Sequence, residues 1–458
     1  MRVKDFIFNS QSLCLRNPRH KLIMLGKIHR NEENMKSSIL KVKTPYTIPK
    51  EKNLDNSIKL LSEAYLFIPN RIRKYNSEIF HTRLMGQKAI CMSGKKAATI
   101  FYNQNWFTRE DTMPRRFQET LFGKNAIQTL SGAAHMHRKL LFMTIMAPIQ
   151  IDKIVALTKK QWLMCAERWE DKTQVILFDE SVSLLFKVAC RWAGVPLDKS
   201  EAKQRSADMS AMIDAFGAVG SRHWKGRYAR NRSECWARKI IQDVRSGRLI
   251  PSPDSALYQI TWHKDLSGSL LNKQIAAVEL INILRPITAI ATYITFGALA
   301  LHTYPSFKER LQQGDEKYLT MFTQEVRRFY PFAPFLGARV RRDFKWHNLC
   351  FKKGTLVLLD LYGTNHDPKI WDKPNSFQPE HFLNREQNPF DFIPQGGGDY
   401  KEGTRCPGEL LTVELLNVSL DYLANHLKYQ VPIQDLTYSL HRIPTLPKSK
   451  FIINNVRM

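Results

Sequence analysis

The sequence predicts a mainly α-helical fold with small β-sheets, and three observations lead to this prediction. Between residues 97 and 312, apolar residues recur mostly at helical spacing, with polar breaks between the segments. Short runs that alternate apolar and polar residues lie near 79–92, near 338–360 and close to the C-terminus. No internal repeat is visible. We therefore expect helices to dominate and the sheets to be small.

Composition and charge restrict the class of protein. Of the 458 residues, 43% are hydrophobic and 24% are charged, which excludes a disordered, collagen-like or disulfide-framework protein. Apolar stretches contain charges before about 18 residues, so we expect no membrane span. The net charge of +27 is spread along the whole chain, and no nucleic-acid-binding motif accompanies it. We therefore expect a solvated basic surface and no nucleic-acid partner.

The N-terminal segment differs from the rest of the chain. Residues 1–34 are basic and poor in acids, which is typical either of an organellar transit peptide or of an extension that precedes a start at Met35. We expect residues 1–52 to be a basic extension, disordered or outside the functional chain, and residues 53–458 to form the folded domain. Helical patterning begins after the capping side chains at 53–56, with apolar residues at Ile58, Leu61, Tyr65 and Ile68.

The first strands are expected directly after this helical segment. The runs 79–84 and 89–92 alternate apolar and polar residues, and a turn that contains Gly86 joins them. This pattern predicts a β-hairpin. Helices are then expected up to about residue 312.

The segment 274–302 is the most informative helix. It is apolar on nearly all sides, so we expect it to run through the centre of the protein. Pro286 cannot donate to the carbonyl of Asn282, which predicts a kink there. The preceding residue, Arg285, needs an anion if it is buried, because an unpaired buried charge is unstable. That anion is either an internal Asp or Glu or the carboxylate of a ligand.

A glycine-rich loop contains one of the seven cysteines. Cys406 follows the run 392–398 and precedes an apolar helical run from residue 410 to 427. A thiolate near a helix N-terminus and cationic side chains is stabilised and can bind haem iron. The alternative is an ordinary glycine loop with an incidental Cys. The other cysteines lack paired spacing, which suits a reducing compartment, and most of them should be core residues.

Several motifs together resemble the cytochrome P-450 superfamily. Glu325 and Arg328 lie three residues apart on one helical face, where they can form a structural pair, and the segment 377–380 and the Cys406 loop follow them. Arg285-Pro286, the runs 331–338 and 359–368 and the glycine-rich loop resemble the bacterial fatty-acid peroxygenases within that superfamily. This resemblance extends from about Leu54 to the C-terminus. It implies a cytochrome P-450-like fold, with haem b between a long central helix and the Cys406 loop.

The resemblance also implies roles for single residues. Cys406 corresponds to the axial ligand of the haem iron, and Arg285 corresponds to the arginine that holds the substrate carboxylate. Further implied positions are Pro286 and Gln128 beside the reacting groups, His135, Lys139 and Arg405 at the haem, and Phe122, Phe216, Phe332 and Phe335 along the substrate channel.

Two residues depart from the family pattern. Thr404 stands where relatives usually carry His, which puts one contact at the haem edge in doubt. His381 replaces the expected Arg after Pro379-Glu380, which weakens the case for a complete Glu-Arg-Arg network. We expect these changes to affect haem retention or stability.

The implied activity is hydroxylation of long-chain fatty acids at the α or β carbon by hydrogen peroxide, with minor decarboxylation to terminal alkenes. No reductase is required, and we expect a cytoplasmic enzyme. Members of the superfamily that activate dioxygen use an acid–Thr pair in the central helix, whereas this chain carries Arg285-Pro286 there, so no protein acid is in place. The next hydroxyl, that of Thr288, should bond to the carbonyl of Leu284. The carboxylate held by Arg285 would then act as general acid and base. Two other functions are compatible with the sequence: a reductase-dependent haem monooxygenase, and a catalytically silent protein that binds haem or lipid.

Overall fold

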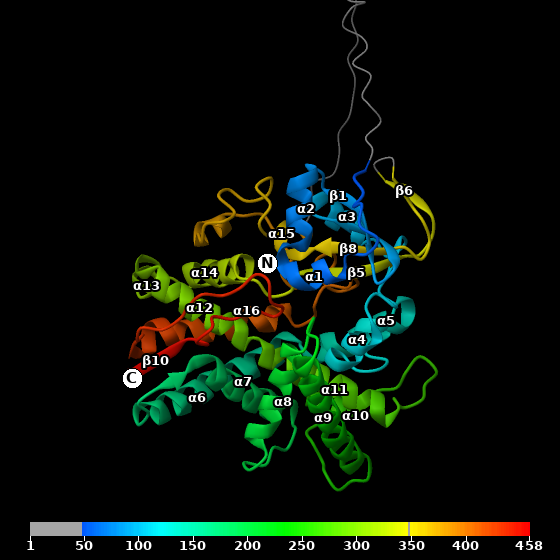
Figure 1. Cartoon of the computed structure of the whole chain (residues 1–458). Coiled ribbons are helices and arrows are strands. Elements are labelled where there is room, and N and C mark those ends of the chain that lie inside the picture. Colours follow the sequence, from blue (N-terminus) through cyan, green and yellow to red (C-terminus); the bar gives the residue numbers. More distant parts are fainter. Residues whose placement is uncertain (1–47, 347–348) are drawn as a thin grey trace, which may run out of the picture. The chain divides into compact units, whose positions relative to one another are not determined.

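Helices account for most of the fold (Figure 1). The structure is a computed structural model that describes residues 48–346 and 349–458. The α-helices are α1 Ser57–Glu63, α2 Phe67–Tyr75, α3 Lys95–Phe101, α4 Arg115–Leu121, α5 Gly132–Ile145, α6 Pro148–Glu170, α7 Leu177–Ala193, α8 Ala202–Asp214, α9 Ser221–Arg245, α10 Ala256–Thr261, α11 Lys273–Ala289, α12 Ala291–Thr303, α13 Pro305–Leu311, α14 Glu316–Phe329, α15 Leu361–Thr364 and α16 Glu409–Asp421. Shorter helical turns are η1 Ala64–Leu66, η2 Ile127–Thr129, η3 Pro379–Phe382 and η4 Tyr422–His426.

The strands are short, as expected. They are β1 Ile79–Leu84, β2 Gln87–Met92, β3 Phe107–Thr108, β4 Val175–Ile176, β5 Phe335–Val340, β6 Phe344–Trp346, β7 Leu349–Phe351, β8 Leu356–Asp360, β9 Lys428–Gln430 and β10 Ile452–Arg457. They form a five-stranded sheet in the order β1-β2-β8-β5-β3 and two smaller sheets. The predicted mainly α fold with small sheets is confirmed.

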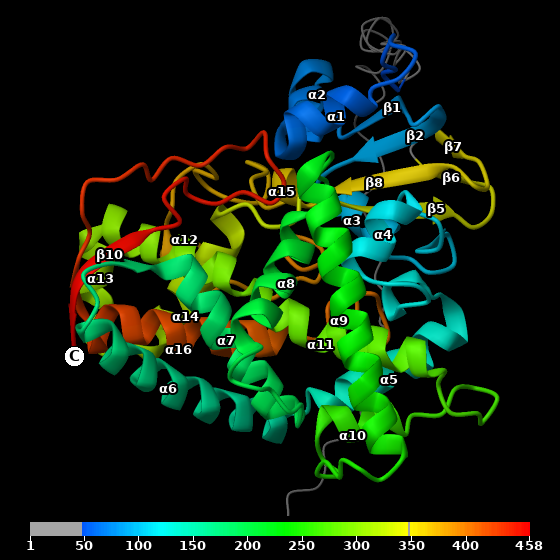
Figure 2. The same cartoon turned by 60° about the horizontal axis from the view of Figure 1, so that its bottom comes forward.

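The predicted hairpin is β1 and β2, which pair antiparallel with Ile79 opposite Met92. Both residues of its turn, Met85 and Gly86, have positive φ angles (52° and 73°), as two-residue hairpin turns require. Because side chains alternate along a strand, Ile90 packs into the cluster on one face of the sheet and Cys91 into the cluster on the other. Figure 2 shows α2 and α3 beside this sheet.

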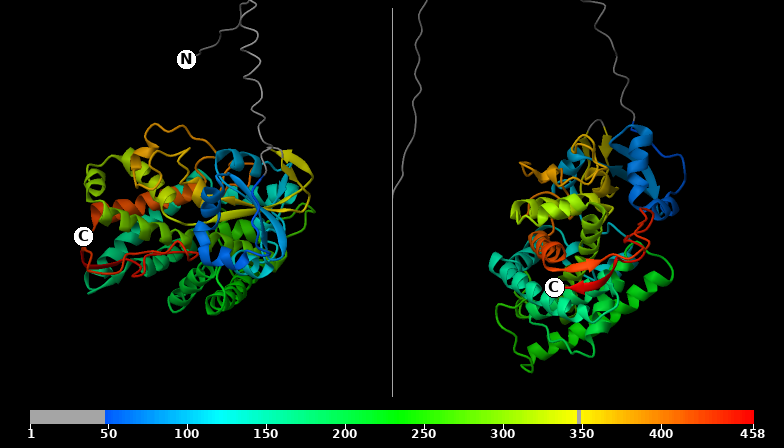
Figure 3. Two further views of the ribbon diagram at one scale, coloured as in Figure 1. Left: turned by 45° about the horizontal axis from the view of Figure 1, so that its top comes forward. Right: turned by 90° about the vertical axis from the view of Figure 1, so that its left-hand side faces the viewer.

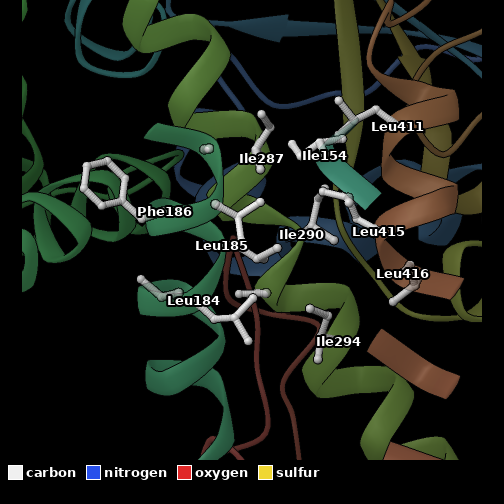
Figure 4. Close-up of a cluster of buried hydrophobic side chains, with 14 of the residues drawn as sticks. Ile154, Leu184, Leu185, Phe186, Ile287, Ile290, Ile294, Leu411, Leu415 and Leu416 are labelled. Atoms are coloured by element: carbon white, nitrogen blue, oxygen red, sulfur yellow. The ribbon is translucent and has the colours of Figure 1, made fainter. Parts of the chain in front are cut away.

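The central helix is buried along its whole length, as predicted. From Ala276 to Leu301 every residue is buried except Pro286, which is half-buried. Figure 4 shows Ile287, Ile290 and Ile294 pointing into a cluster formed with α6, α7 and α16. The helical backbone continues through Pro286, and its one-residue interruption lies at Ile290 instead. The kink expected at Pro286 stays a prediction, since α11 includes the proline without a break in the helix.

The same helix explains the single membrane-span signal among the described residues. Residues 273–303 are long and apolar enough to cross a membrane, but 89% of the most apolar window is buried inside the fold. This is the behaviour of the core helix of a soluble protein. Helices α5 and α6, bent by 51° relative to each other, pass the same test only as a pair.

The ends of the described chain are anchored to the helices. The C-terminal segment, red in Figure 3, runs past η1, where the backbone N–H of Tyr65 donates to the carbonyl of Leu440 at 3.1 Å. Near the other end, Glu51 accepts hydrogen bonds from Arg71 and Thr82, so residues 48–52 belong to the fold. The rest of the extension predicted for residues 1–52, residues 1–47, lies outside the described residues.

Two details differ from the expectations. Ile58 and Leu61, which follow the helical spacing of α1, are 82% and 41% exposed, so α1 lies on the surface. Among the cysteines, Cys91, Cys165 and Cys190 are buried as expected, whereas Cys235 and Cys350 are exposed.

Candidate active site

Arg285 lies inside the protein without a carboxylate partner in the described part of the chain. Its side chain is 6% exposed, and its guanidinium makes one long hydrogen bond, from Nη2 to Oδ1 of Asn282 at 3.5 Å. Its Nε has no partner among the described residues, and the guanidinium lies 5.7 Å from the ring centre of Phe122. Burial, with a smaller contribution from the charge of Arg230, lowers the pKa of Arg285 to about 9, while Cys406 opposes the shift. Such a cation requires an anion.

These contacts favour one of the two anions considered for Arg285, an internal Asp or Glu or the carboxylate of a ligand. The internal salt bridge is absent among the described residues, so a ligand carboxylate is the better candidate for the missing anion. The buried acid nearest along α11, Glu279, is already paired with Arg138 at 2.7 Å.

The three residues expected beside the reacting groups lie together. Gln128, in η2, has Oε1 3.5 Å from Nδ2 of Asn282, one helical turn before Arg285. Pro286 follows Arg285 and is the one incompletely buried residue of this helix between Ala276 and Leu301. The hydroxyl of Thr288 donates to the carbonyl of Leu284 at 2.9 Å, as predicted. Thr288 is therefore engaged with the backbone.

Cys406 lies in a closely packed loop before α16. Its N–H donates to the carbonyl of Gln395 at 3.3 Å. Burial raises the pKa of the Cys406 thiol, and the backbone N–H of Gly408 counteracts part of this shift. Gly397 is needed because a Cβ there would lie 2.5 Å from the carbonyl oxygen of Pro389. This glycine therefore permits close packing within the protein, in addition to the approach to a flat ligand that the sequence suggests.

Two cationic side chains, Lys139 and Arg109, and the imidazole of His135 gather around the same loop. The Lys139 ammonium donates to the carbonyls of Gly403 and Arg405. Burial lowers the pKa of Lys139 to about 8 and that of His135 to about 4. Arg109 and His135 line one small cavity together with Thr404. Neither Lys139 nor Arg109 forms an ion pair with a residue that the structure describes, so these two cations have charge available for an anionic group.

The sequence did not indicate Arg109. Its Nη2 donates to Oγ1 of Thr404 at 3.3 Å and its Nη1 to the carbonyl of Gly337 at 3.1 Å. The positions are 295 residues apart, and a single Arg after Phe107-Thr108 carries no motif. Arg109 therefore contributes a cation at the position where the replacement of His by Thr404 left a contact in doubt.

A haem fits these residues. The half-buried thiol of Cys406 can bind the iron. Lys139 and Arg109, which form no ion pair among the described residues, can hold the two propionates, and the imidazole of His135 can add a hydrogen bond. Arg405, which was expected at the haem, already donates to Glu409, which also accepts from Arg327. The role of Arg405 at a cofactor stays a prediction.

The four phenylalanines expected along the substrate channel lie in different surroundings. Phe122 lies beside Arg285. Phe332 stacks on Tyr293 at 4.6 Å between ring centres, and Phe335 packs against the cluster beneath α2. Phe216 is half-buried in the turn between α8 and α9. Of the four phenylalanines, only Phe122 lies against a predicted site residue in the contacts given above. The role of the other three along the substrate channel stays a prediction.

The structural pair of α14 is complete. Glu325 and Arg328 are both fully buried and joined at 2.6 Å. His381 fills the third position, with Nδ1 3.2 Å from both carboxylate oxygens of Glu325 and Nε2 against the carbonyl of Asp372. The expected weakening of the network by His381 is not seen, because the shorter side chain still reaches Glu325.

A groove of about 1480 Å³ lies away from these residues. It runs between α6, α7 and α8 and includes none of the predicted site residues.

Comparisons with known proteins indicate the family and the fold of this chain. The family model described as Cytochrome P-450 matches residues 299–442. The structure of cytochrome P-450EX alpha with myristic acid has a TM-score of 0.87 and 44% identity, covering 90% of this chain and 99% of that one. A cytochrome P-450SP alpha variant has a TM-score of 0.87 and 41% identity, covering 89% and 100%. A variant of cytochrome P-450 OleT in complex with arachidonic acid has a TM-score of 0.87 and 37% identity, covering 90% and 98%.

More distant similarity extends to plant and animal proteins. Protopanaxadiol 6-hydroxylase of Panax ginseng is 22% identical over 414 residues, which cover 82% of this chain and 85% of that protein. Cytochrome P-450 3A29 of Sus scrofa is 28% identical over 154 residues, or 31% of its length.

Proposed function

The chain belongs to the bacterial fatty-acid peroxygenase family of the cytochromes P-450, and we propose that Arg285 binds the carboxylate of its fatty-acid substrate beside the haem. As a member, it is a haem-containing oxidoreductase that hydroxylates fatty acids. The observation that carries the proposal is that Arg285 is buried and has no carboxylate partner among the described residues. A bound fatty acid supplies the missing charge, and its alkyl chain can extend past Phe122.

Cys406 is the proposed ligand of the haem iron, and Arg109, His135 and Lys139 are the proposed partners of its propionates. When bound, the haem supplies the redox chemistry that breaks the peroxide O–O bond and transfers one oxygen to carbon. In the overall reaction a C–H bond becomes C–OH, hydrogen peroxide is reduced, and water leaves.

The protein itself supplies position and proton transfer. Two N–H groups of Arg285 can hold a carboxylate in a planar, two-pronged contact, which fixes the α and β carbons near the iron. Each carboxylate oxygen keeps a second lone pair in this contact, so the carboxylate can still take a proton from one peroxide oxygen and return it to the other. Thr288 cannot replace it in this step, because its hydroxyl donates to the carbonyl of Leu284. Gln128, rather than His, favours hydroxylation over decarboxylation in this proposal.

The catalytically silent alternative loses its motivation. It rested on Thr404 and His381, and both side chains have partners that maintain the surrounding network. The proposal also places the enzyme in the cytoplasm, because its unpaired cysteine spacing suits a reducing compartment.

The experiment compares the purified full chain, loaded with haem, with Arg285→Ala and Arg285→Lys. We expect Arg285→Ala to keep its haem and to weaken long-chain fatty-acid binding at least tenfold, or about 1.4 kcal/mol, in a spectral titration. Peroxide-driven turnover should be nearly lost. Lys keeps the charge but not the planar fork, so Arg285→Lys should lie between the two.

The control variant is Arg248→Ala, at an exposed arginine paired with Asp243. It should match the unmodified enzyme. Unchanged affinity and turnover in Arg285→Ala would disprove the carboxylate contact. Turnover that needs an electron-transfer partner and not peroxide would instead favour the reductase-dependent monooxygenase.

A further inference from the structure

Glu279 is a carboxylate with no exposed surface that joins three parts of the site. It lies on α11, six residues before Arg285, and is 0% exposed. Its Oε1 accepts from Nη1 of Arg138 at 2.7 Å and from the backbone N–H of Ile127 at 2.9 Å. Its Oε2 accepts from Nδ2 of Asn282 at 3.2 Å. The carboxylate thus connects α5, η2 and α11.

Asn282 transmits the effect of this carboxylate to Arg285. Its Nδ2 donates to Glu279 and to the carbonyl of Phe122 at 3.0 Å, and both partners can only accept. The amide oxygen must therefore face the other way, where it lies 3.5 Å from Nη2 of Arg285. A reversed amide would place oxygen against oxygen at Glu279 and N–H against N–H at Arg285.

The distribution of charge around Arg285 leaves its guanidinium free to pair with a ligand carboxylate. Arg138 neutralises Glu279, so this acid does not form an ion pair with Arg285. The neutral Asn282 fills the space between them and offers the guanidinium a weak acceptor. An arginine oriented by an amide is held in place, yet its full charge remains for a ligand carboxylate.

We propose that Glu279 is a positioning residue for the reaction, acting on Arg285 through the amide of Asn282 and on Gln128 through the backbone of Ile127. This inference rests on the proposed function, because it requires Arg285 to bind the substrate carboxylate. The competing explanation is purely structural: a buried Glu279–Arg138 pair that joins α11 to α5 and has no effect on the substrate.

The test replaces Glu279 with Gln in the haem-loaded full chain. Gln still offers one oxygen to Arg138 and Ile127, but its NH2 group takes the place of Oε2 and opposes Nδ2 of Asn282. Asn282 must then turn, and its N–H groups face Arg285. We expect fatty-acid affinity to fall about fivefold to tenfold. Hydroxylation should also spread beyond the two carbons next to the carboxylate, which a purely structural role would not cause.

A second variant and a double variant keep the test decisive. Asn282→Ala removes the link but leaves the Glu279–Arg138 pair, and it should weaken affinity and broaden the products in the same direction. Glu279→Gln added to Arg285→Ala should change neither quantity further, because its effect acts through Arg285. Asp208→Asn is the matched control, since Asp208 is also buried and paired, with Arg232, away from these contacts.

Two results would overturn the proposal. Wild-type affinity and product positions in Glu279→Gln and Asn282→Ala, with at most a lower melting temperature, would show that the role is structural. If Glu279→Gln does not fold, Asn282→Ala alone decides. Should Arg285→Ala itself retain affinity, the proposed function fails, and that result is distinct from a failure of the two positioning variants alone.

Discussion

Arg285 shows how one side chain depends on its surroundings. The sequence placed it in a buried helix, but whether an acid would meet it depended on how 122–138 packs against α11. The structure shows that Arg138 occupies the nearby Glu279 and that an amide, from Asn282, faces Arg285. Arg138 and Glu279 are 141 residues apart in the chain, and no local pattern specifies such a pair.

His135 gives a pH prediction at the same scale. Burial lowers its pKa from 6.5 to about 4, and the charges of Lys139 and Arg109 contribute. Between these values the unfolded chain binds a proton that the folded haem-free protein does not. The contribution of neutral His135 to the free energy of unfolding is therefore complete above pH 6.5. It is lost as the pH falls towards 4, and the loss is at most about 3 kcal/mol.

The measurement is urea unfolding of haem-free protein at several pH values between 7.5 and 4.5. The variant His135→Asn should lose less stability over this range than the unmodified chain. Parallel curves for the two proteins would contradict the assignment. With haem propionates nearby, the difference should shrink, because an anion favours the charged imidazole.

At the scale of elements, periodicity was sufficient for most of the helices and for the hairpin. The run 274–302 was predicted as a buried central helix, and it is one, although the interruption lies at Ile290 and not at Pro286. Neighbouring helices determine where a helix tolerates a proline, and the chain's own pattern does not contain that information. The exposed Ile58 of α1 shows the same limit, since apolar spacing indicates a helix but not what covers it.

His381 yields a prediction about the connection between α14 and η3. Its Nδ1 faces Glu325 and its Nε2 faces the carbonyl of Asp372, and both partners accept, so both bonds form together only in the imidazolium. Replacing it with Phe leaves a fully buried carboxylate with fewer partners. We expect His381→Phe to lower the free energy of unfolding by about 1–3 kcal/mol.

His381→Arg is the matched comparison, because Arg can make the same contacts and is the residue that relatives carry. It should keep the stability of the unmodified protein, as measured by thermal unfolding of the haem-loaded chain. Equal melting temperatures for all three proteins would show that His381 contributes nothing to the network.

At the scale of the whole molecule, the site is assembled from distant parts. Residues near 109, 135, 285 and 404 lie around the Cys406 loop. The sequence connected the last three only through the resemblance to a known family, and it did not indicate Arg109. Arg109 was missed because its partner, Thr404, is 295 residues away and itself departs from the pattern that the family resemblance implies. Fold and ligand loop were predictable, whereas the full set of cations was not.

Removal of a cation from this cluster should therefore weaken haem retention more than it affects the fold. Lys139→Met keeps the length of the side chain and removes its charge. We expect haem to transfer from this variant to excess apomyoglobin at least several-fold faster than from the unmodified protein. The matched control, Lys153→Met on α6, removes an exposed lysine paired with Asp254 and should not change the rate. Equal rates for Lys139→Met and the unmodified protein would remove Lys139 from the haem site.

The central claim is that Arg285 holds the fatty-acid carboxylate over the haem that Cys406 binds. The most direct measurement is a peroxide-driven reaction of the haem-loaded protein with a long-chain fatty acid, with the hydroxyl position determined by mass spectrometry. The account predicts products hydroxylated only at the α and β carbons, and near-complete loss of these products in Arg285→Ala. Hydroxylation towards the methyl end, or the same α and β products from Arg285→Ala, would contradict it.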